Sequence, residues 1–317
     1  MIVTHGLAVP ATPPAGHAVI IGNFDGVHMG HQAMIARAIA SARDRDVLPC
    51  ALTFEPHPRE VFAPEQAPTR LTSMREKMEL LSNYGLVRAH IERFTKEFAA
   101  LTPQTFVEQV LVQTLAARWV LVGGDFRFGA RRAGDVAMLR ELGQQHGFEV
   151  EAMPNVMQGG ERVSSSSVRA ALAAGDLARA AVLLGRHYSI SGSVVHGDKL
   201  GRDLGFATAN VRMQHNRPPL SGIFAVRLHG VGAQALDGVA SLGVRPTVKA
   251  AGAEAVLEVH VFDFSGEIYG EHVRVEFLSK IRDEEKYPDL DTLKAQIARD
   301  CEAARQVLLE FRQNHRI

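Results

Sequence analysis

The chain has 317 residues, of which 46% are hydrophobic, 22% charged and 6% aromatic. This composition is typical of a folded globular protein and excludes a disordered or fibrous chain. Lys plus Arg and Asp plus Glu each number 35, so the formal net charge is zero. A neutral chain argues against a protein that binds nucleic acid over a broad basic surface. The two cysteines, Cys50 and Cys301, provide no disulfide framework.

The N-terminal segment does not predict export or membrane insertion. It lacks a basic start followed by a long apolar core, so it does not resemble a signal peptide. No stretch approaches the roughly 20 apolar residues that cross a bilayer, and the most apolar region, residues 106–122, is interrupted by Glu108 and Arg118. We therefore expect a soluble cytoplasmic enzyme with no nucleic-acid partner and no membrane partner.

The first half of the chain alternates between strand-like and helix-like periods. Helices are expected after residue 31, over 71–81, from Thr102 onward and near 133–146. Strands are expected over 18–21, 47–54, 86–91, 119–122 and 147–152. Alternation at this spacing predicts βαβ units and a doubly wound parallel sheet.

The pattern changes after about residue 185. Short alternating runs at 188–195, 223–228, 238–244, 256–264 and 273–277 predict a small antiparallel barrel or sandwich. A closing helix is expected, with one apolar face formed by Leu293, Ile297, Cys301, Ala304 and Leu308. These observations predict two domains, over residues 1–185 and 186–317.

The first chemical motif is His28-Met29-Gly30-His31, at the point where a strand leads into a helix. Ligands bind at the carboxyl ends of strands in such sheets, and a helix N-terminus favours anions. Histidines at i and i+3 are neighbours on a helix, and Gly30 keeps side-chain bulk away from the backbone between them. The motif indicates a nucleotidyltransferase site that stabilises charge at the α-phosphate of a nucleotide. A chance match and a metal cluster of His28, His31 and His57 are alternatives.

Three further segments lie at expected strand ends or helix starts. Asp125 lies in the loop 124–129 after a strand, and the serines of segment 164–169 open a helix together with Arg169. Serine hydroxyls and an arginine suit phosphate, although a tight turn and an ordinary helix cap explain each segment equally well. The loop 55–58 and the nearby Phe62 are consistent either with a wall for a flat ring or with a turn and a core residue.

In this order, IGNFDGVHMGH, TFEPHP, GGDFRFG and SSSSVR resemble the adenylyltransferase module of prokaryotic bifunctional riboflavin kinase/FAD synthetases. The resemblance covers essentially the whole first half and implies transfer of AMP from ATP to FMN, which gives FAD and pyrophosphate. It implies that His28 and His31 are catalytic and hold the ATP phosphates. It implies ATP contacts at Gly22, Asn23, Phe24, Asp25, Gly30, Asp125, Ser165 and Arg169. It implies a wall for the flavin ring at Pro56, Pro58, Phe62 and Phe128. Ser166 and Val168 depart mildly from the family's SSTxIR.

The second half carries HGDKLGRDLGFATAN, residues 196–210. Its glycines allow the backbone to approach phosphates, and its basic residues add positive charge; they are Gly197, Gly201, Gly205, Lys199 and Arg202. The Walker order is absent, so a glycine-rich hairpin turn is an alternative. Thr208 and Asn210 would share one face of a strand, where their oxygen atoms suit magnesium that arrives with a nucleotide.

Glu258 lies in the middle of an apolar run. A charge there costs free energy unless it is paired or functional. It is either on the solvated face of an edge strand or a general base that takes the proton of an attacking hydroxyl during phosphoryl transfer.

GRDLGFATAN, SGIFAV, SLGVRPTV, LEVHVFDFSGEIYG and FLSKIRDEEKY resemble the riboflavin kinase module of the same family. This resemblance implies a six-stranded barrel that phosphorylates riboflavin to FMN. It implies that Thr208 and Asn210 assist Mg-ATP and that Glu258 is the base on the ribityl hydroxyl. It places Arg282, Asp283 and Glu284 in a flap on the flavin side. Ala207 stands where the family's PTAN motif has proline.

The two resemblances together predict a bifunctional enzyme that uses ATP, riboflavin and FMN, with Mg²⁺ at both sites. One alternative retains only one of the two activities. Another is a flavin-binding or RNA-binding module on the same fold. The neutral charge and the lack of interleaved aromatic and basic residues disfavour RNA.

Overall fold

The computed structural model of the chain describes residues 1–7, 16–196, 206–215, 217–245 and 254–314. The chain forms two compact units. The first unit contains residues 1–68 and 74–164, and the second contains residues 69–73 and 165–317. The division therefore falls earlier than the boundary at 185/186 expected from the change of pattern, because residues 165–184 make their contacts with the barrel unit. Where the two functional domains meet stays a prediction.

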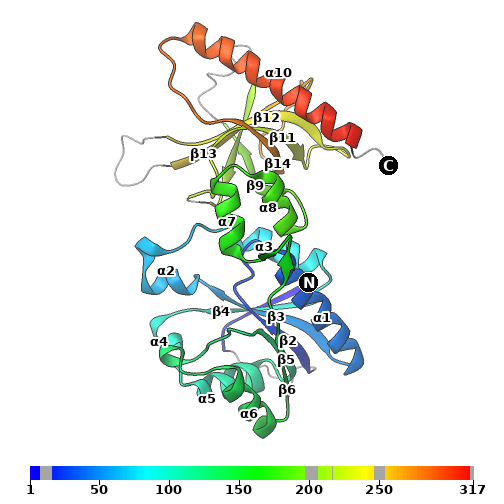
Figure 1. The fold of residues 1–317 in the computed structure, drawn as a ribbon, viewed down its shortest axis with the longest axis vertical. Coiled ribbons are helices and arrows are strands. Elements are labelled where there is room, and N and C mark those ends of the chain that lie inside the picture. Colours follow the sequence, from blue (N-terminus) through cyan, green and yellow to red (C-terminus); the bar gives the residue numbers. More distant parts are fainter. Residues whose placement is uncertain (8–15, 197–205, 216, 246–253, 315–317) are drawn as a thin grey trace. The chain divides into compact units, whose positions relative to one another are not determined.

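The first unit contains a parallel sheet of six strands in the order β1-β4-β3-β2-β5-β6 (Figure 1). The predicted doubly wound parallel sheet is confirmed. The strand order reverses between β2 and β5, and in sheets of this kind ligands bind at such a reversal, beyond the carboxyl ends of the strands. The strands are β1 (Ile2–His5), β2 (His17–Ile21), β3 (Leu48–Glu55), β4 (Arg88–Arg93), β5 (Ala117–Gly123) and β6 (Glu149–Met153).

Helices and short turns connect these strands. The helices are α1 (Met29–Asp44), α2 (Pro58–Phe62), α3 (Met74–Asn83), α4 (Lys96–Ala99), α5 (Pro103–Phe106), the π-helix η2 (Val107–Thr114) and α6 (Val136–His146), with 3-10 turns η1 (Pro64–Gln66) and η3 (Ala130–Arg132). A hairpin of β7 (Met157–Gln158) and β8 (Glu161–Arg162) follows. Thr102 caps the helical segment that starts at Pro103, as the sequence predicts.

Both faces of the sheet are buried, as expected for a parallel sheet covered by helices. On one face Val19 and Ile21 of β2 pack with residues of η2 and α6, and on the other Ala18 and Ile20 pack with α1. The alternation follows from the strand period of two. Because both faces of the sheet are covered, a ligand is expected at the loops that follow the carboxyl ends of β2 and β5.

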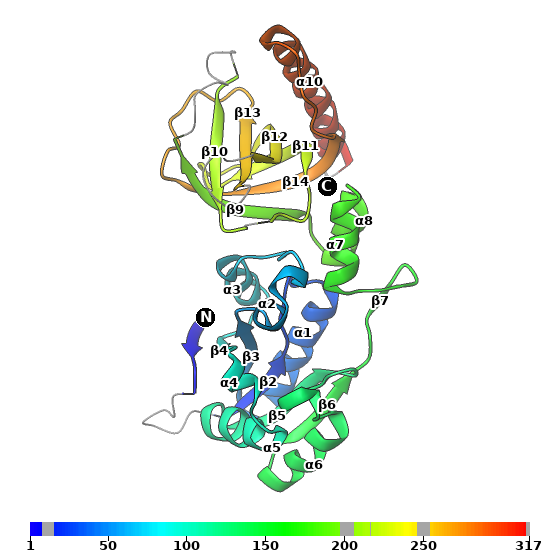
Figure 2. The same cartoon turned by 90° about the vertical axis from the view of Figure 1, so that its left-hand side faces the viewer.

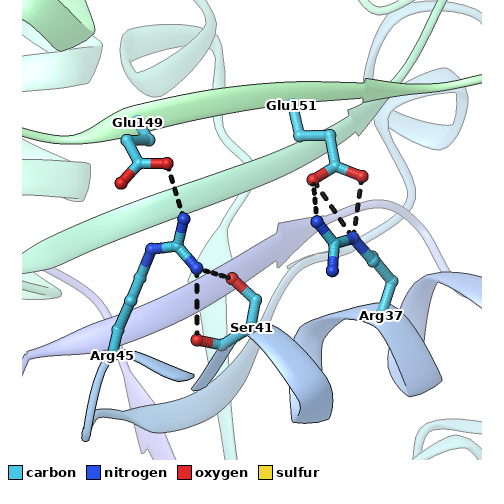
Figure 3. A network of polar contacts seen from close by, with 5 residues as sticks. All are labelled: Arg37, Ser41, Arg45, Glu149 and Glu151. Carbon is cyan, nitrogen blue, oxygen red and sulfur yellow. Dashed lines mark hydrogen bonds and ion pairs between the residues drawn. The ribbon is translucent and has the colours of Figure 1, made fainter. Parts of the chain in front are cut away.

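Two arginines fix α1 against the outer strand β6 (Figure 3). Arg37 makes a bidentate pair with Glu151, with contacts of 2.7–3.1 Å, and Arg45 Nη2 lies 2.5 Å from Glu149 Oε2. Both guanidinium groups also lie 5.7–6.0 Å from the ring centre of the buried Trp119. These contacts fix the position of α1 against the sheet, and therefore also the position of its N-terminus at the sheet edge.

His17 is fully buried at the start of β2. Its Nδ1 lies 2.5 Å from the Leu115 carbonyl oxygen and its Nε2 2.9 Å from Arg88 Nη1. Since a carbonyl only accepts and a guanidinium only donates, Nδ1 carries the hydrogen and Nε2 accepts. Burial, and secondarily the nearby Arg88 charge, lower the pKa of His17 despite the Leu115 hydrogen bond.

This geometry predicts an acid-sensitive first unit. A lowered folded-state pKa means that the stabilisation is complete above the unfolded value of about 6.5 and is lost as pH falls through the range below it. His17→Gln should therefore flatten the fall of the unfolding free energy between pH 7.5 and 5.5, by up to about 1.4 kcal/mol per pH unit. Urea unfolding at several pH values measures this slope. Equal slopes for the wild type and the variant would contradict the prediction.

The second unit is built on a closed antiparallel barrel of six strands in the order β10-β13-β12-β11-β14-β9 (Figure 2). The predicted antiparallel barrel is confirmed. The strands are β9 (Tyr188–Val195), β10 (Thr208–Met213), β11 (Gly222–His229), β12 (Leu236–Arg245), β13 (Glu254–Val261) and β14 (His272–Arg282). The predicted alternation in β13 is also observed, with Leu257, Val259 and Val261 buried.

Among the described residues of the second unit, the helices α7 (Ser165–Ala173), α8 (Leu177–Leu184) and α10 (Leu290–Asn314) accompany the barrel. The predicted closing helix is α10, which packs on the outer surface of β11, β12 and β14. Its Cys301, Ala304 and Leu308 form a small core with Ala225 and Val239. The outer surface of β10, β13 and β12 carries the opposed polar residues Asn210, Glu258 and Ser241.

Candidate functional site

The loop between β2 and α1 places two histidines at the reversal point of the sheet. His28 is the N-cap of α1 in an extended conformation, and its Nδ1 accepts a hydrogen bond from the His31 backbone N–H at 3.4 Å. The two rings stack with centres 3.7 Å apart and an interplanar angle of 17°. Because Nδ1 accepts, the hydrogen of neutral His28 lies on Nε2, which makes that atom a donor.

Gly30 allows this ring stack to form. A Cβ at position 30 would lie 3.1 Å from Cε1 of His28, closer than side chains normally approach. The structure thus gives glycine at this position a role in packing the His28 ring, and the predicted approach of a phosphate to the Gly30 backbone stays a prediction. The first turn of α1 contributes the partial positive charge of a helix N-terminus at the same place.

The residues that precede this motif and are predicted to bind ATP lie in the same loop. Phe24 is fully buried, adopts a positive φ of 48°, and meets the His31 ring edge-on at 5.1 Å. The Phe24 side chain therefore packs against the ring of His31. Gly22 lies next to the Phe24 ring, since a Cβ at position 22 would be 3.3 Å from Phe24 Cζ. The Asn23 carbonyl accepts from Thr53 Oγ1 at 3.3 Å, and Asp25 is buried.

Asp125 follows β5, the strand beside β2, so it lies at the same edge of the sheet. Its carboxylate is 69% exposed and lies 2.8 Å from Arg162 Nη2. The hydrogen bond from Arg162 holds the pKa of Asp125 below its ordinary value. The loop therefore carries an ionised carboxylate at this sheet edge, and its contact with ATP stays a prediction.

Ser165 and Arg169 lie on α7 in the second unit, as the predicted helix start requires. Arg169 Nε donates to the Thr69 carbonyl at 2.5 Å. Their contact with ATP phosphates stays a prediction.

The predicted flavin wall is part of a longer series of aromatic rings. Phe62 is 62% exposed and meets Phe94 edge-on at 5.9 Å, and Phe94 lies 5.7 Å from Phe98. The series continues from Phe98 through Phe106 to the buried Phe128 with centre distances of 6.2 and 5.6 Å. Flat aromatic surfaces are suited to contact an isoalloxazine ring.

Sequence reasoning found only the two ends of this series. Phe54, Phe94 and Phe126 also lie at the ends of β3, β4 and β5. Aromatic residues recurring at strand ends provided a signal for them. Pro56 lies in the adjoining turn and Pro58 is the first residue of α2, which His57 caps by accepting from Arg59 N at 3.2 Å.

The metal alternative places His57 together with His28 and His31, but the Nδ1 of His57 accepts the capping hydrogen bond of α2. Among the described residues, no three His, Cys, Asp or Glu side chains are grouped so that they could hold a metal ion. A cluster of His28, His31 and His57 is therefore not supported by the geometry.

In the second unit, strand register assembles a polar patch on the outer barrel surface. Asn210 of β10 lies directly opposite Glu258 of β13, and Glu258 lies directly opposite Ser241 of β12. Thr208 lies opposite His260 in the adjacent row. Directly opposed residues have Cβ atoms about 4.5–5.5 Å apart, so the predicted ligand Asn210 lies beside the predicted base Glu258. Thr208 is a diagonal neighbour of Glu258, at the larger spacing of about 7–8 Å.

Glu284 joins this patch from the segment after β14. It accepts a hydrogen bond from the Ser241 side chain, and burial raises the pKa of its carboxyl group. A Cβ on Gly243 would overlap the Glu284 carboxylate. Ser241 and Gly243 thus form a seat for this side chain, which the sequence did not predict. The reason is that the seat depends on a contact between segments about 40 residues apart.

The other two predicted flap residues make different contacts. Arg282 forms a bidentate pair with the buried Asp300 of α10 at 2.6 and 2.8 Å. Asp283 is exposed and pairs with Lys280 at 2.5 Å. The glycine-rich loop residues Gly197, Lys199, Gly201, Arg202 and Gly205 lie outside the described residues.

Comparison with known proteins agrees with this arrangement. The family described as FAD synthetase matches residues 11–167, and the riboflavin kinase family matches residues 184–308. The bifunctional riboflavin kinase/FMN adenylyltransferase of Escherichia coli K12 is 46% identical over 93% of both chains. The chain belongs to this bifunctional family.

Other members of the bifunctional riboflavin kinase/FMN adenylyltransferase family are similar over nearly the whole chain. The relative from Haemophilus influenzae is 42% identical, over 92% of this chain and 94% of its own. A crystal structure described as a macrolide-efflux protein from Streptococcus pneumoniae aligns with a TM-score of 0.81 and 29% identity, covering 96% of this chain and 99% of its own. Within the described part of the chain, no helix combines the length and apolar composition needed to cross a membrane.

Proposed function

We propose that the second unit phosphorylates riboflavin with ATP and that the first unit transfers AMP from a second ATP to the resulting FMN. The observation that carries the proposal is the co-occurrence of both family matches in one chain. Two pairs of predicted site residues support it: His28 and His31 stack on each other at the start of α1, and Asn210 and Glu258 are opposed on adjacent barrel strands. The product of one reaction is the substrate of the other. The products are ADP, pyrophosphate and FAD.

In the adenylyl transfer, an oxygen of the FMN phosphate attacks the α-phosphorus of ATP. The bond from that phosphorus to the α–β bridging oxygen breaks, and pyrophosphate leaves. His28 and His31 donate hydrogen bonds to the phosphate oxygens as negative charge develops, and the N-terminus of α1 adds to this stabilisation. Because the stabilising groups are fixed in advance, little reorganisation is needed during the reaction.

In the phosphorylation, Glu258 takes the proton of the terminal ribityl hydroxyl. The hydroxyl oxygen forms a bond to the γ-phosphorus, the bond to the β–γ bridging oxygen breaks, and ADP leaves. The neighbouring Asn210 and Ser241 flank Glu258 on the two adjacent strands. Because successive side chains of a strand point to opposite faces and Leu257 and Val259 are buried inside the barrel, the Glu258 carboxylate is directed to the outer face.

Families that use ATP in these ways generally require a divalent metal, and we propose Mg²⁺. The hydroxyl of Thr208 and the amide oxygen of Asn210 are hard oxygen donors on one strand face, which fits an ion held mainly by nucleotide phosphates and water. When bound, the ion would offset the negative charge of the phosphates. We further propose that ATP, riboflavin and FMN are the substrates, that neither nucleic acid nor membrane is a partner, and that the enzyme acts in the cytoplasm.

The Glu284 seat predicts a selective defect in the kinase reaction. Gly243→Ala should displace the Glu284 carboxylate and raise the KM for riboflavin about tenfold, which corresponds to about 1.4 kcal/mol. Ser241→Ala, which removes only the hydrogen bond, should have a smaller effect in the same direction. Steady-state kinetics with varied riboflavin measure the change, while FMN-to-FAD conversion provides the internal control. An unchanged riboflavin KM in Gly243→Ala would refute the flavin-side role of Glu284.

A time course tests the proposed function. The purified protein is incubated with riboflavin, excess ATP and MgCl₂, and flavins are separated by chromatography. FMN should appear before FAD. FMN without FAD would refute the role of the first unit. No FMN from riboflavin, with added FMN still converted to FAD, would refute the role of the barrel. Neither product from a folded sample would favour a flavin-binding or RNA-binding module.

A further inference from the structure

A hydrogen bond from a strand residue to the backbone fixes the start of β10. His260 of β13 lies opposite Thr208, and its Nδ1 is 2.9 Å from the Ala207 carbonyl oxygen. A carbonyl oxygen only accepts, so Nδ1 of His260 carries the hydrogen and donates it. The bond therefore restrains the peptide group that directly precedes Thr208.

The His260 ring is itself held in place by its neighbours. Phe206 meets it edge-on at 5.5 Å and Phe262 at 5.7 Å, with interplanar angles of 84° and 73°. The guanidinium of Arg305 from α10 lies 4.2 Å from the Phe262 ring centre and makes two hydrogen bonds to Asp263. Packing of this kind selects one ring orientation, which keeps Nδ1 directed at the Ala207 carbonyl.

The restraint acts at the position where this chain departs from its family's PTAN motif. A proline would lock φ of residue 207 near −65°. Alanine leaves that torsion free, so the backbone before Thr208 depends more on its other contacts. The hydrogen bond from His260 is such a contact, and it lies one residue from the hydroxyl that the proposed function assigns to Mg-ATP.

We propose that His260 is a positioning residue for the nucleotide half of the kinase site. Its Nδ1–H holds the Ala207 carbonyl and thereby the Thr208 hydroxyl in the place required by Mg-ATP. The proposal rests on the proposed kinase function, and His260 does not itself contact a substrate in it. Its specific consequence is that the defect should fall on nucleotide binding and leave riboflavin binding unaffected.

Two variants of His260 separate the hydrogen bond from the packing. His260→Phe keeps an aromatic ring but removes the donor, whereas His260→Asn places an amide N–H close to the position of Nδ1. We expect His260→Phe to raise the Kd for Mg-ADP and the KM for Mg-ATP about tenfold, and His260→Asn to retain most of the wild-type values. The Kd for riboflavin, measured by quenching of its fluorescence, should remain unchanged in both variants.

A proline at residue 207 provides an independent test. Ala207→Pro in the His260→Phe background should recover most of the Mg-ADP affinity, because the ring restores the restraint in another way. Ala207→Pro alone should change little. The two substitutions would then be non-additive, as expected for residues that act on the same backbone segment.

Calorimetric titration with Mg-ADP and thermal unfolding of each full-length variant decide the outcome. Selective loss of Mg-ADP affinity in His260→Phe, with recovery by either Asn or proline, supports the proposal. The proposal is overturned if riboflavin and Mg-ADP affinity fall equally or if the barrel loses stability. It is also overturned if neither the asparagine nor the proline substitution restores Mg-ADP affinity. Because the titration needs no turnover, absence of riboflavin phosphorylation in the wild type would count against the proposed function and would leave this test intact.

Discussion

Glu258→Gln is expected to abolish FMN formation from riboflavin while FMN-to-FAD conversion continues at the wild-type rate. The amide has nearly the same shape as the carboxylate but cannot take the proton of the ribityl hydroxyl. Loss of a general base typically costs 10²–10⁴ in rate. Glu258 lies on the outer barrel surface between Asn210 and Ser241, so the neutral substitution should not disturb the core.

Initial rates of ADP release with riboflavin measure this effect, and chromatography with added FMN provides the control. Arg274→Gln is a matched control, since it also neutralises a charge on a barrel strand, but on β14, which is not paired with β13, at a position opposite Ser191. That control should keep its kinase rate. A kinase rate in Glu258→Gln within a few fold of the wild type would show that Glu258 is not the base.

His28→Asn is expected to have the opposite selectivity. It should lower adenylyl transfer to FMN by about 10²–10³, the typical cost of losing one preorganised donor to a developing negative charge. Asparagine is a favoured N-cap residue, so its side chain can still accept from the first turn of α1. The variant therefore removes the imidazole Nε2 and the ring stack with His31 while it keeps the helix cap.

Pyrophosphate release with FMN and ATP measures this rate, and riboflavin phosphorylation in the same sample is the control. His146→Asn, at the other end of a different helix, tests for a general effect of losing a histidine and should leave both activities unchanged. If His28→Asn transfers AMP at the wild-type rate, the proposed contact of His28 with the ATP phosphates is wrong.

The sequence predicted most of the fold because its regular elements have strong local patterns. The run of buried residues in β2 and the alternation in β13 are visible in the sequence, and both elements formed as expected. The strand β1 was not predicted, since its four residues are exposed and it is held by pairing with β4. Pairing partners distant in sequence leave no periodic signal.

The candidate site shows the same limit. The motif His28–His31 could be predicted because its residues are neighbours in the chain. By contrast, the place of Ser241 beside Glu258 depends on the register of two strands, and the seat of Glu284 depends on the absence of a side chain at Gly243. Neither relation follows from the local sequence. The family resemblance found the residues of each motif but not the residues that hold them in position.

The measurement that tests the central claim most directly combines the two variants in one reaction. Glu258→Gln and His28→Asn are each incubated with riboflavin, ATP and MgCl₂, separately and as an equimolar mixture, and FAD is followed by chromatography. We predict no FAD from Glu258→Gln, FMN without appreciable FAD from His28→Asn, and FAD from the mixture, because FMN made by one variant is adenylylated by the other. Substantial FAD from either variant alone, or none from a mixture that converts added FMN, would contradict two separate sites that act in this order.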